Sequence, residues 1–300
     1  MKSLRLRLPA TSANLGPGFD ALGLAMAFYL TVEATVADAF RIEATGRNAD
    51  LCGDANNSLI FKTYTDVLVK NGKIAAPLRL ILHNEIPLGM GCGSSAAALL
   101  AGALLANYFG ELGWSDQQIL EETCHREGHP DNVAACFLGG MTASAENASK
   151  ILTATYRENI NWSLLVSLPA ASLATEKARA LLPNSYSRAD AVGNVQNTAL
   201  LVSAFALNRG DLLRVAMQDR IHQPYRMEAC PLLKKLLPLM GASGVLGVAL
   251  SGAGPSVLTI VEVGAEAAVT AAIREAAGDP GLEIIQTTIA GGTEAIPEVE

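Results

Sequence analysis

The sequence is poor in aromatic residues, cysteine and long apolar runs. Phe, Trp and Tyr make up 5% of the 300 residues. Five cysteines, an odd number with no C-x-x-C spacing, argue against a disulfide framework and fit a reducing compartment. The longest apolar run, 96–106, is too short to span a bilayer, and segment 1–9 alternates basic and apolar residues, unlike a signal peptide. We therefore expect a cytoplasmic protein.

The charge balance restricts the partners of the protein. There are 29 acidic and 22 basic residues, which gives a formal net charge of −7. This acidity argues against nucleic acid or an anionic membrane as the main partner, so any basic site must be local. A zinc site built from Cys124, His125 and His129 is a weak alternative, because no second closely spaced pair of ligands accompanies them.

Hydrophobic patterns and turn residues predict strands and helices in an irregular order. Strands are expected at 4–8, 22–35, 40–45, 78–84, from 139, 163–168, 245–250, 257–263 and 282–288. Helices are expected at 58–70, 94–109, 115–127, 175–182, 189–208, 211–218, 231–239 and 265–277. The irregular order indicates an α+β protein, and the best boundary divides it into domains 1–160 and 161–300.

The segment that carries most information is P-L-G-M-G-C-G-S-S-A-A-A at residues 87–98. Gly89, Gly91 and Gly93 have no side chains, so their backbone N–H groups can approach a ligand closely. A helix that starts near Ser94 adds free N–H groups and the positive end of its dipole, which favour a phosphate anion. The alternative is a glycine-rich loop that merely packs tightly.

Several common nucleotide-binding motifs do not describe this loop. The chain contains no G-x-x-x-x-G-K-[ST] sequence, and the glycines at every second position do not form a dinucleotide fingerprint. It also lacks the H-R-D and D-F-G motifs of protein kinases. A different kind of nucleotide enzyme is therefore expected.

Three further segments combine turn residues with polar side chains. They are P-A-T-S-A-N-L-G-P-G-F-D at 9–20, E-G-H-P-D-N at 127–132 and L-S-G-A-G-P-S at 250–256. The first is expected as an ordered loop between two strands, and the second as a tight loop after a helix that ends in a carboxylate. Each has a purely structural alternative, as a turn or, for the third, a hairpin.

Taken together, these four segments resemble the GHMP small-molecule kinase superfamily, and the segments at 9–20 and 127–132 resemble its homoserine-phosphorylating branch. The resemblance runs from residue 9 to residue 256. It implies an N-terminal ribosomal-protein-S5-domain-2-like domain and a C-terminal ferredoxin-like domain. It also implies that ATP phosphorylates the side-chain hydroxyl of L-homoserine in threonine biosynthesis, and it is compatible with a homodimer.

The same resemblance implies a nucleotide site with Mg²⁺. Ser95 and a helix glutamate would hold the metal, with Glu127 slightly favoured over Glu121. The residues implied to bind ATP are Asn57, Pro87, Leu88, Gly89, Met90, Gly91, Cys92, Gly93, Ser94, Ser95, Ala96, Gly252 and Gly254.

The acceptor site follows from the resemblance and from the chemistry of homoserine, a zwitterion that carries a hydroxyl. Asp20 suits the ammonium group, and Arg179 and Arg226 suit the carboxylate, because a guanidinium binds a carboxylate through two hydrogen bonds. The residues implied to complete the pocket are Asn14, His129 and Asn132.

The general base is left open by the sequence. Asn132 stands where some relatives have an aspartate and cannot accept a proton at neutral pH, so either the hydroxyl attacks directly or Asp131 or His129 serves as the base. A decarboxylase on the same fold has no use for Asp20. A catalytically dead sensor would be expected to lack the serine and glutamate ligands, which are present here.

Overall fold

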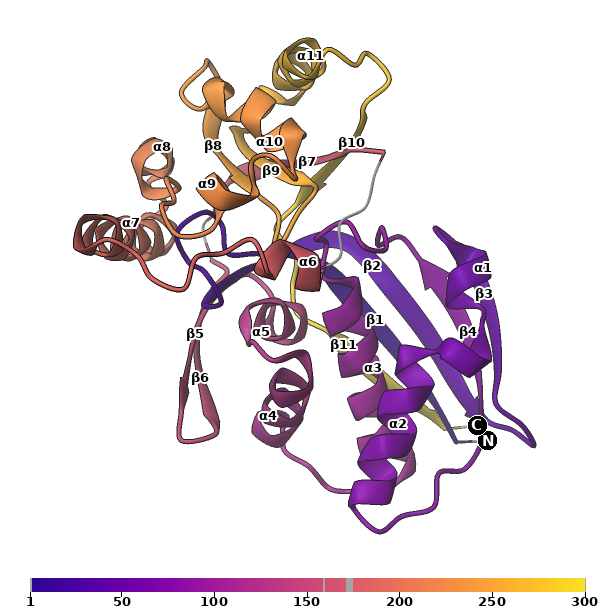
Figure 1. Cartoon of the computed structure of the whole chain (residues 1–300). Coiled ribbons are helices and arrows are strands. Elements are labelled where there is room, and N and C mark those ends of the chain that lie inside the picture. Colours follow the sequence, from indigo (N-terminus) through magenta and orange to yellow (C-terminus); the bar gives the residue numbers. More distant parts are fainter. Residues whose placement is uncertain (1, 159, 171–174, 300) are drawn as a thin grey trace.

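The computed structural model describes residues 2–158, 160–170 and 175–299. Its first sheet has seven strands in the order β11-β1-β2-β4-β3, with β5 paired to β2 and β6 to β5. These strands are β1 (Lys2–Ala13), β2 (Leu22–Val36), β3 (Arg41–Gly46), β4 (Leu78–Asn84), β5 (Met141–Asn147), β6 (Lys150–Tyr156) and β11 (Glu294–Val299). The two chain ends lie side by side, because β11 pairs antiparallel with β1 (Figure 1).

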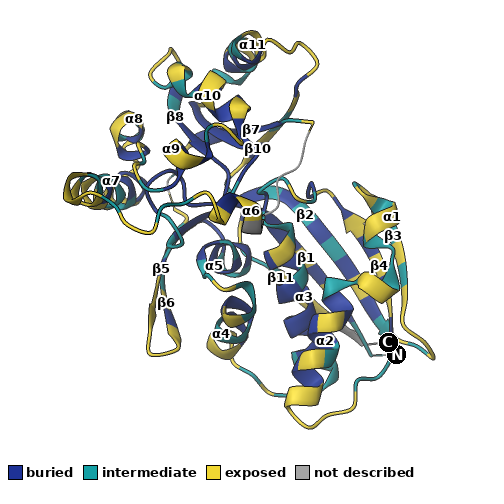
Figure 2. Cartoon of the chain, viewed as in Figure 1, coloured by how far each residue is buried: buried dark blue, intermediate teal, exposed yellow. Residues whose placement is uncertain are grey.

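Helices cover one face of this sheet (Figure 1). They are α1 (Ala49–Cys52), α2 (Leu59–Lys70), α3 (Ser94–Phe109), α4 (Asp116–Glu127) and α5 (Asp131–Leu138), with a short 3₁₀ turn, η1 (Ala55–Asn57). Helix α3 packs centrally and is buried along most of its length (Figure 2). Its alanines allow the neighbouring helices and the sheet to approach closely, which explains why a helix apolar on all sides is suited to this position.

The second sheet has four antiparallel strands in the order β10-β7-β9-β8. They are β7 (Trp162–Leu168), β8 (Val245–Leu250), β9 (Val257–Glu262) and β10 (Glu283–Thr288). The helical elements of this half are α6 (Thr175–Arg179), α7 (Arg188–Ala206), η2 (Gly210–Leu212), α8 (Leu213–Ala216), α9 (Gln223–Arg226), α10 (Pro231–Leu236), η3 (Leu237–Leu239) and α11 (Glu266–Ala277). In the part of the chain that the structure describes, no helix is long and apolar enough to cross a bilayer.

Most elements lie where the sequence predicts them, and the mixed α+β class is confirmed. The structure differs from the prediction at several places. Residues 9–13, expected as loop, form the end of β1, because they continue its pairing with β2. Residues 131–138 are a helix that directly follows the E-G-H-P segment. Strands β6 and β11 were not predicted at all. The predicted helix 175–182 ends at Arg179.

The predicted division at residue 160 stays a prediction. It falls between the strands of the two sheets, but β11 carries the C-terminal end of the chain back to the first sheet. The two halves also meet at the turn after β1, where Pro17 O accepts hydrogen bonds from Asn194 Nδ2 (2.7 Å) and Thr198 Oγ1 (3.0 Å) of α7.

Candidate active site

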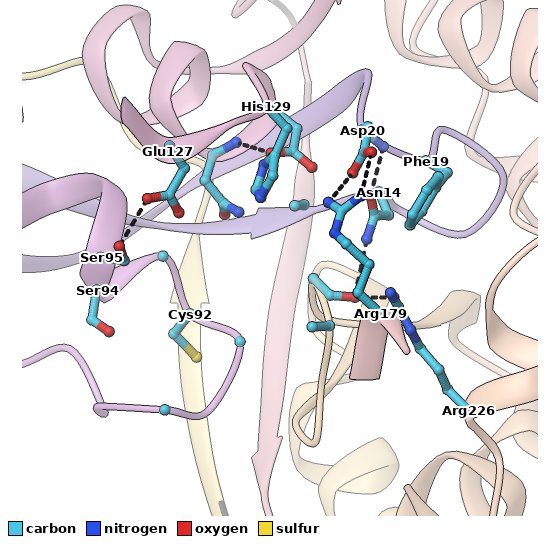
Figure 3. Close-up of a pocket in the computed structure, with 18 residues that line it drawn as sticks. Asn14, Phe19, Asp20, Cys92, Ser94, Ser95, Glu127, His129, Arg179 and Arg226 are labelled. Carbon is cyan, nitrogen blue, oxygen red and sulfur yellow. Dashed lines mark hydrogen bonds and ion pairs between the residues drawn. The ribbon is translucent and has the colours of Figure 1, made fainter. Parts of the chain in front are cut away.

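A polar cavity of about 260 Å³ lies where the two halves meet (Figure 3). Its walls come from the turn after β1, the glycine-rich loop before α3, the connection between α4 and α5, and the ends of α6 and α9. The turn between β8 and β9 closes it with Gly252 and Ala253. Segments from opposite ends of the chain therefore share one site, as the hydrogen bond from Asn14 Nδ2 to Gly252 O (3.0 Å), across 238 residues, shows directly.

The glycine-rich loop is shaped by close contact with its neighbours. Gly91 and Gly93 have φ angles of +76° and +74°. A Cβ atom on Gly91 would lie 2.2 Å from Ser251 O, and one on Gly93 would lie 1.9 Å from Thr11 Oγ1. The carbonyl groups of Gly91 and Cys92 accept hydrogen bonds from Ser251 Oγ (2.7 Å) and Thr11 N (3.0 Å). The loop thus turns its carbonyls outward, while the first N–H groups of α3, which lack helical acceptors, remain available to an anion.

We expect Gly91→Ala to raise KM for ATP at least about tenfold, because the new Cβ must displace the loop from Ser251 and the phosphate contacts depend on its shape. Gly113→Ala is the matched control: its φ is +68°, but a Cβ there meets nothing within 4 Å. The control should lose about 1 kcal/mol of stability with an unchanged KM for ATP. Equal KM values in both variants would contradict the close-contact argument.

Ser95 and Glu127 meet at the start of α3. Ser95 Oγ donates a hydrogen bond of 2.8 Å to Oε2 of Glu127, which is the last residue of α4 (Figure 3). Burial raises the pKa of Glu127 above its ordinary value, although the Ser95 hydroxyl opposes the shift. Among the described residues, no cationic side chain forms an ion pair with this carboxylate. A carboxylate that forms no ion pair and lies beside a hydroxyl is a suitable oxygen donor set for Mg²⁺.

Glu121, the other predicted metal ligand, does not line this cavity. Its carboxylate accepts a hydrogen bond of 2.8 Å from Gln117 Nε2, which also donates to Ile151 O at 2.9 Å. Glu121 and Glu127 are six residues apart on α4, so they project from different faces of the helix. The geometry therefore favours Glu127.

His129 and Asp131 form a close pair at the start of α5. His129 Nδ1 lies 2.5 Å from Asp131 Oδ1, and this carboxylate, which is 1% exposed, also accepts from Asn132 N (2.7 Å). Burial alone lowers the pKa of His129, but the hydrogen bond and charge of Asp131 outweigh it and raise the pKa. Asn132 Oδ1 accepts from Thr11 Oγ1 (2.7 Å), which leaves the Asn132 amide nitrogen to donate.

The raised pKa of His129 predicts a pH-dependent contribution to stability. The imidazolium–Asp131 pair stabilises the folded chain fully below about pH 6.5, the ordinary value for histidine, and this contribution is lost as the pH rises through the folded pKa. We therefore expect Asp131→Asn to cost about 1 kcal/mol more at pH 5.5 than at pH 9. Urea unfolding of both proteins at the two pH values measures this difference, and a cost that is equal or larger at pH 9 would contradict it.

The predicted acceptor residues surround the other end of the cavity. Asp20 N donates to Asn14 Oδ1 (3.0 Å), and the Asp20 carboxylate accepts two hydrogen bonds of 2.8 Å from the Arg179 guanidinium. The structure therefore pairs Asp20 with Arg179, whereas the sequence suggested separate ligands for ammonium and carboxylate. Arg226 is 1% exposed, and Phe19 lies beneath both guanidinium groups, 5.3 and 5.5 Å from their carbons.

A second, more apolar cavity of about 340 Å³ adjoins the first through Ser94 and Ser95. It is lined by the predicted residues Asn57 and Leu88 and by apolar side chains that include Leu51, Ile60, Leu82, Ile86 and Ala98. Asn57 Nδ2 donates to Asp54 Oδ2 at 2.5 Å, which fixes the 3₁₀ turn. A flat apolar group can be buried here while an attached phosphate chain reaches the start of α3.

Some residues predicted to bind the nucleotide line neither cavity, and some residues of the site were not predicted. Neither cavity is lined by Pro87, Met90, Ala96 or Gly254. Thr11, Phe19 and His222 were not predicted. Thr11 and Phe19 stand within the P-A-T-S-A-N-L-G-P-G-F-D segment, so the sequence motif around them indicated their place in the site. His222 is recognisable only from its three-dimensional contacts. The described His, Cys, Asp and Glu residues that come close enough to share a metal here are Asp20, His129 and Asp131, and not the zinc set considered above.

Sequence comparisons agree with this geometry. Residues 58–140 match the family described as GHMP kinases N terminal domain, and residues 201–278 match GHMP kinases C terminal. The homoserine kinase of Solibacter usitatus (strain Ellin6076) is 47% identical over 263 residues, covering 87% of this chain and 86% of that protein. The chain belongs to the homoserine kinase family of GHMP kinases.

Further relatives support this membership. The homoserine kinase of Desulfitobacterium hafniense is 42% identical, over 86% of this chain and 87% of that protein. The crystal structure of homoserine kinase from Cytophaga hutchinsonii is similar with a TM-score of 0.81 and 26% identity, covering 98% of this chain and 97% of that one. The predicted family and fold are thereby confirmed.

Proposed function

We infer that this homoserine kinase family member transfers the γ-phosphoryl group of ATP to the side-chain hydroxyl of L-homoserine. The hydroxyl oxygen attacks the γ-phosphorus, the bond to the β-phosphate oxygen breaks, ADP leaves and the hydroxyl proton is released. One observation carries this function: the phosphate loop, the Ser95–Glu127 pair and the Asp20–Arg179–Arg226 group line a single cavity. The product is O-phospho-L-homoserine, in threonine biosynthesis.

Ser95 and Glu127 are proposed to hold Mg²⁺ with the ATP phosphates. The metal would neutralise charge that develops on the phosphoryl oxygens, which is the main demand of this reaction on its catalyst. Support comes from the half-buried Glu127 carboxylate: burial raises its pKa even though the Ser95 hydroxyl and the charge of His129 oppose the shift, and among the described residues it forms no ion pair. Binding can be measured without turnover, as the shift in melting temperature that Mg²⁺ and a non-hydrolysable ATP analogue produce in wild type and in Ser95→Ala.

Homoserine is proposed to bind between Asp20 and the two arginines. Its ammonium group would take the place of a guanidinium at the Asp20 carboxylate, and its carboxylate would bind Arg226 together with the released Arg179. The exchange conserves ion pairs, since each charged group that loses a partner gains one of the opposite sign from the zwitterion. Asn14, which holds the Asp20 backbone, keeps the carboxylate in place.

His129 is proposed to take the hydroxyl proton, while Asn132 orients the reacting groups. Asp131 is buried and already accepts from His129 and Asn132, and Asn132 uses its oxygen to accept from Thr11. With Nδ1 facing Asp131, the imidazole retains Nε2 for proton transfer. Because the pKa of His129 is raised, this role requires a rate that increases with pH through the His129 titration, and His129→Gln should abolish that limb.

A coupled assay of ADP release over homoserine, mevalonate, galactose and shikimate tests the substrate assignment. Stimulation by homoserine is expected, because the other three acceptors have no ammonium group for Asp20. If another compound stimulates ADP release and homoserine does not, the substrate assignment is wrong, although the fold is unaffected.

The remaining parts of the proposal concern the surroundings of the enzyme. We place it in the cytoplasm, where ATP is supplied, and expect no nucleic acid or membrane partner, in line with its net charge of −7. A homodimer is also proposed. Much of α7 is exposed (Figure 2). Its Val192 and Val195 are 49% and 68% exposed, which leaves apolar side chains for a second copy to cover. Light scattering of the purified chain measures this directly.

A further inference from the structure

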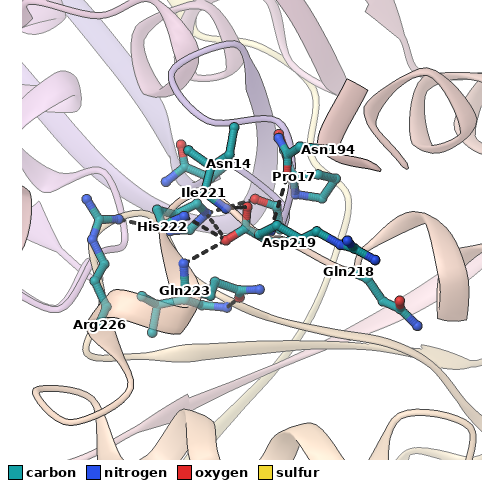
Figure 4. A network of polar contacts seen from close by, with 12 residues as sticks. Asn14, Pro17, Asn194, Gln218, Asp219, Ile221, His222, Gln223 and Arg226 are labelled. Atoms are coloured by element: carbon teal, nitrogen blue, oxygen red, sulfur yellow. Dashed lines mark hydrogen bonds and ion pairs between the residues drawn. The ribbon is translucent and has the colours of Figure 1, made fainter. Parts of the chain in front are cut away.

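His222 lies behind the wall of the acceptor site and does not line the cavity (Figure 4). The side chain is fully buried at 0% exposure, at the position just before α9. Its Nε2 atom lies 2.8 Å from Gly16 O, in the turn that leads to Asp20, and its Nδ1 atom lies 3.1 Å from Arg226 Nη1. One imidazole thus contacts both the turn and the arginine.

The turn depends on outside contacts for its shape. Asn14, Leu15 and Asp20 have φ angles of +72°, +48° and +56°, a left-handed region that is unfavourable above all for Leu15, since Asn and Asp adopt it more readily. Gly16 packs so closely against the other half that a Cβ would lie 2.2 Å from Met217 O. The hydrogen bond from His222 to Gly16 O therefore holds a strained segment whose end presents Asp20 to the cavity.

Arg226 is a buried cation held mainly by neutral groups. Its Nε atom donates to Ala178 O (3.2 Å), and Nη1 donates to His222 Nδ1 and, at 3.5 Å, to Gly252 O. Burial lowers its pKa, and the charge of nearby Arg179 acts in the same direction. In the described part of the chain, no carboxylate forms an ion pair with Arg226. The guanidinium is thus fixed in direction without having its charge neutralised, which suits a group that must bind an anionic ligand.

The contacts of His222 require one particular protonation state. Nδ1 must accept from the guanidinium, so the proton sits on Nε2, which donates to the Gly16 carbonyl. Asp219 lies 3.6 Å from Nε2, but its carboxylate accepts from the backbone N–H groups of Ile221 (2.9 Å), His222 (3.0 Å) and Gln223 (2.6 Å). Burial lowers the pKa of His222 and outweighs the opposing charge of Asp219, while Arg226 acts in the same direction as burial.

We propose that His222, as the neutral imidazole protonated on Nε2, is a positioning residue that aligns the guanidinium of Arg226 with the turn carrying Asp20, so that the carboxylate and ammonium sites match the spacing of one amino acid. The proposal rests on the proposed roles of Arg226 and Asp20. It predicts selectivity for an acceptor that carries both charges.

The test compares homoserine with 3-aminopropan-1-ol, which has the same hydroxyl and ammonium groups but no carboxylate. The measured quantity is the ratio of kcat/KM for the two acceptors, with KM for ATP followed separately. His222→Leu removes both hydrogen bonds and should lower the ratio at least about tenfold, with KM for ATP within about twofold of wild type. His222→Asn keeps an acceptor near the Nδ1 position and should recover part of the ratio. His222→Gln keeps a donor near Nε2 and should recover less, because the carboxylate depends on Arg226.

Gln223→Leu is the matched control for a buried polar change at the same place. Gln223 Oε1 accepts from Leu250 N (2.6 Å), and the hydrogen bonds given above for Arg226 do not involve Gln223, so this variant should lose stability while keeping the ratio. If His222→Leu fails to fold, the comparison of the Asn and Gln variants decides: equal ratios would overturn the proposal. An unchanged ratio in a folded His222→Leu would overturn it too.

Arg226→Ala distinguishes a failure of the proposed His222 role from a failure of the proposed acceptor site. A ratio that stays high in Arg226→Ala means that the carboxylate binds elsewhere, and then the proposed acceptor site fails together with the role of His222. A ratio that collapses in Arg226→Ala but not in His222→Leu overturns the positioning role alone.

Discussion

Glu127→Gln should lower kcat at least tenfold, which corresponds to about 1.4 kcal/mol of activation free energy. The amide keeps the shape of the side chain and can still accept from Ser95 Oγ, now 2.8 Å away, but it carries no charge for the metal. Loss of that charge would weaken the proposed Mg²⁺ site, which would otherwise help to neutralise charge on the phosphoryl oxygens. Steady-state kinetics at several Mg²⁺ concentrations measure the effect, and the Mg²⁺ requirement should rise as kcat falls.

Glu121→Gln provides the matched control on the same helix. Its carboxylate accepts from Gln117 and lies outside the cavity, so this variant should keep the kcat of the wild type. The opposite result, a wild-type kcat in Glu127→Gln and a strongly reduced kcat in Glu121→Gln, would show that Glu121 is the metal ligand.

A stability measurement shows whether lost activity reflects lost folding. Burial raises the pKa of Glu127, so the charged carboxylate destabilises the folded chain at pH values above the ordinary value for glutamate. At pH 8 and without ligands, Glu127→Gln should therefore melt at the same temperature as wild type or slightly higher. A lower melting temperature would mean that the Glu127 carboxylate also stabilises the fold.

Local signals made much of the fold predictable. The capping box of Ser115 and Gln118 marks the start of α4, and the glycine at 128 marks its end with a φ of +91°. The strand 78–84 alternates buried and exposed residues along its whole length, so its two-residue hydrophobic period predicts the strand with its observed boundaries. These elements carry their own start and stop signals, which do not depend on distant parts of the chain.

Pairing between distant segments could not be read from the sequence. Strand β11 is recognisable only through its partner β1, almost 300 residues earlier, since its own residues are short of aliphatic alternation. The same holds in the site: the sequence indicated Asp20 and Arg179 as ligands but not their mutual ion pair across 159 residues. The sequence motifs predicted which chemical groups line the site, whereas the partner that each group contacts depends on tertiary packing.

Arg226→Ala should raise KM for homoserine about 10- to 150-fold, since a charge-assisted hydrogen bond contributes about 1.5–3 kcal/mol. The contact is made equally in the ground and transition states, so kcat and KM for ATP should change little. Arg179→Ala should have the smaller effect. Its side chain is 41% exposed and screened by water, and its removal also leaves Asp20 free for the ammonium group.

Two variants separate binding from folding at Arg226. Arg226→Lys keeps the charge but cannot form two parallel hydrogen bonds to a carboxylate, so it should recover KM only in part. Arg226→Met removes the charge at similar volume. Burial lowers the pKa of Arg226, so removing the charge favours the folded chain without ligand, but it also leaves Ala178 O and His222 Nδ1 without their donor; the Met variant should therefore melt close to wild type. High KM together with undiminished stability in Arg226→Met would show that this arginine is kept for the substrate. An unaltered KM for homoserine in both alanine variants would instead show that neither arginine binds the carboxylate.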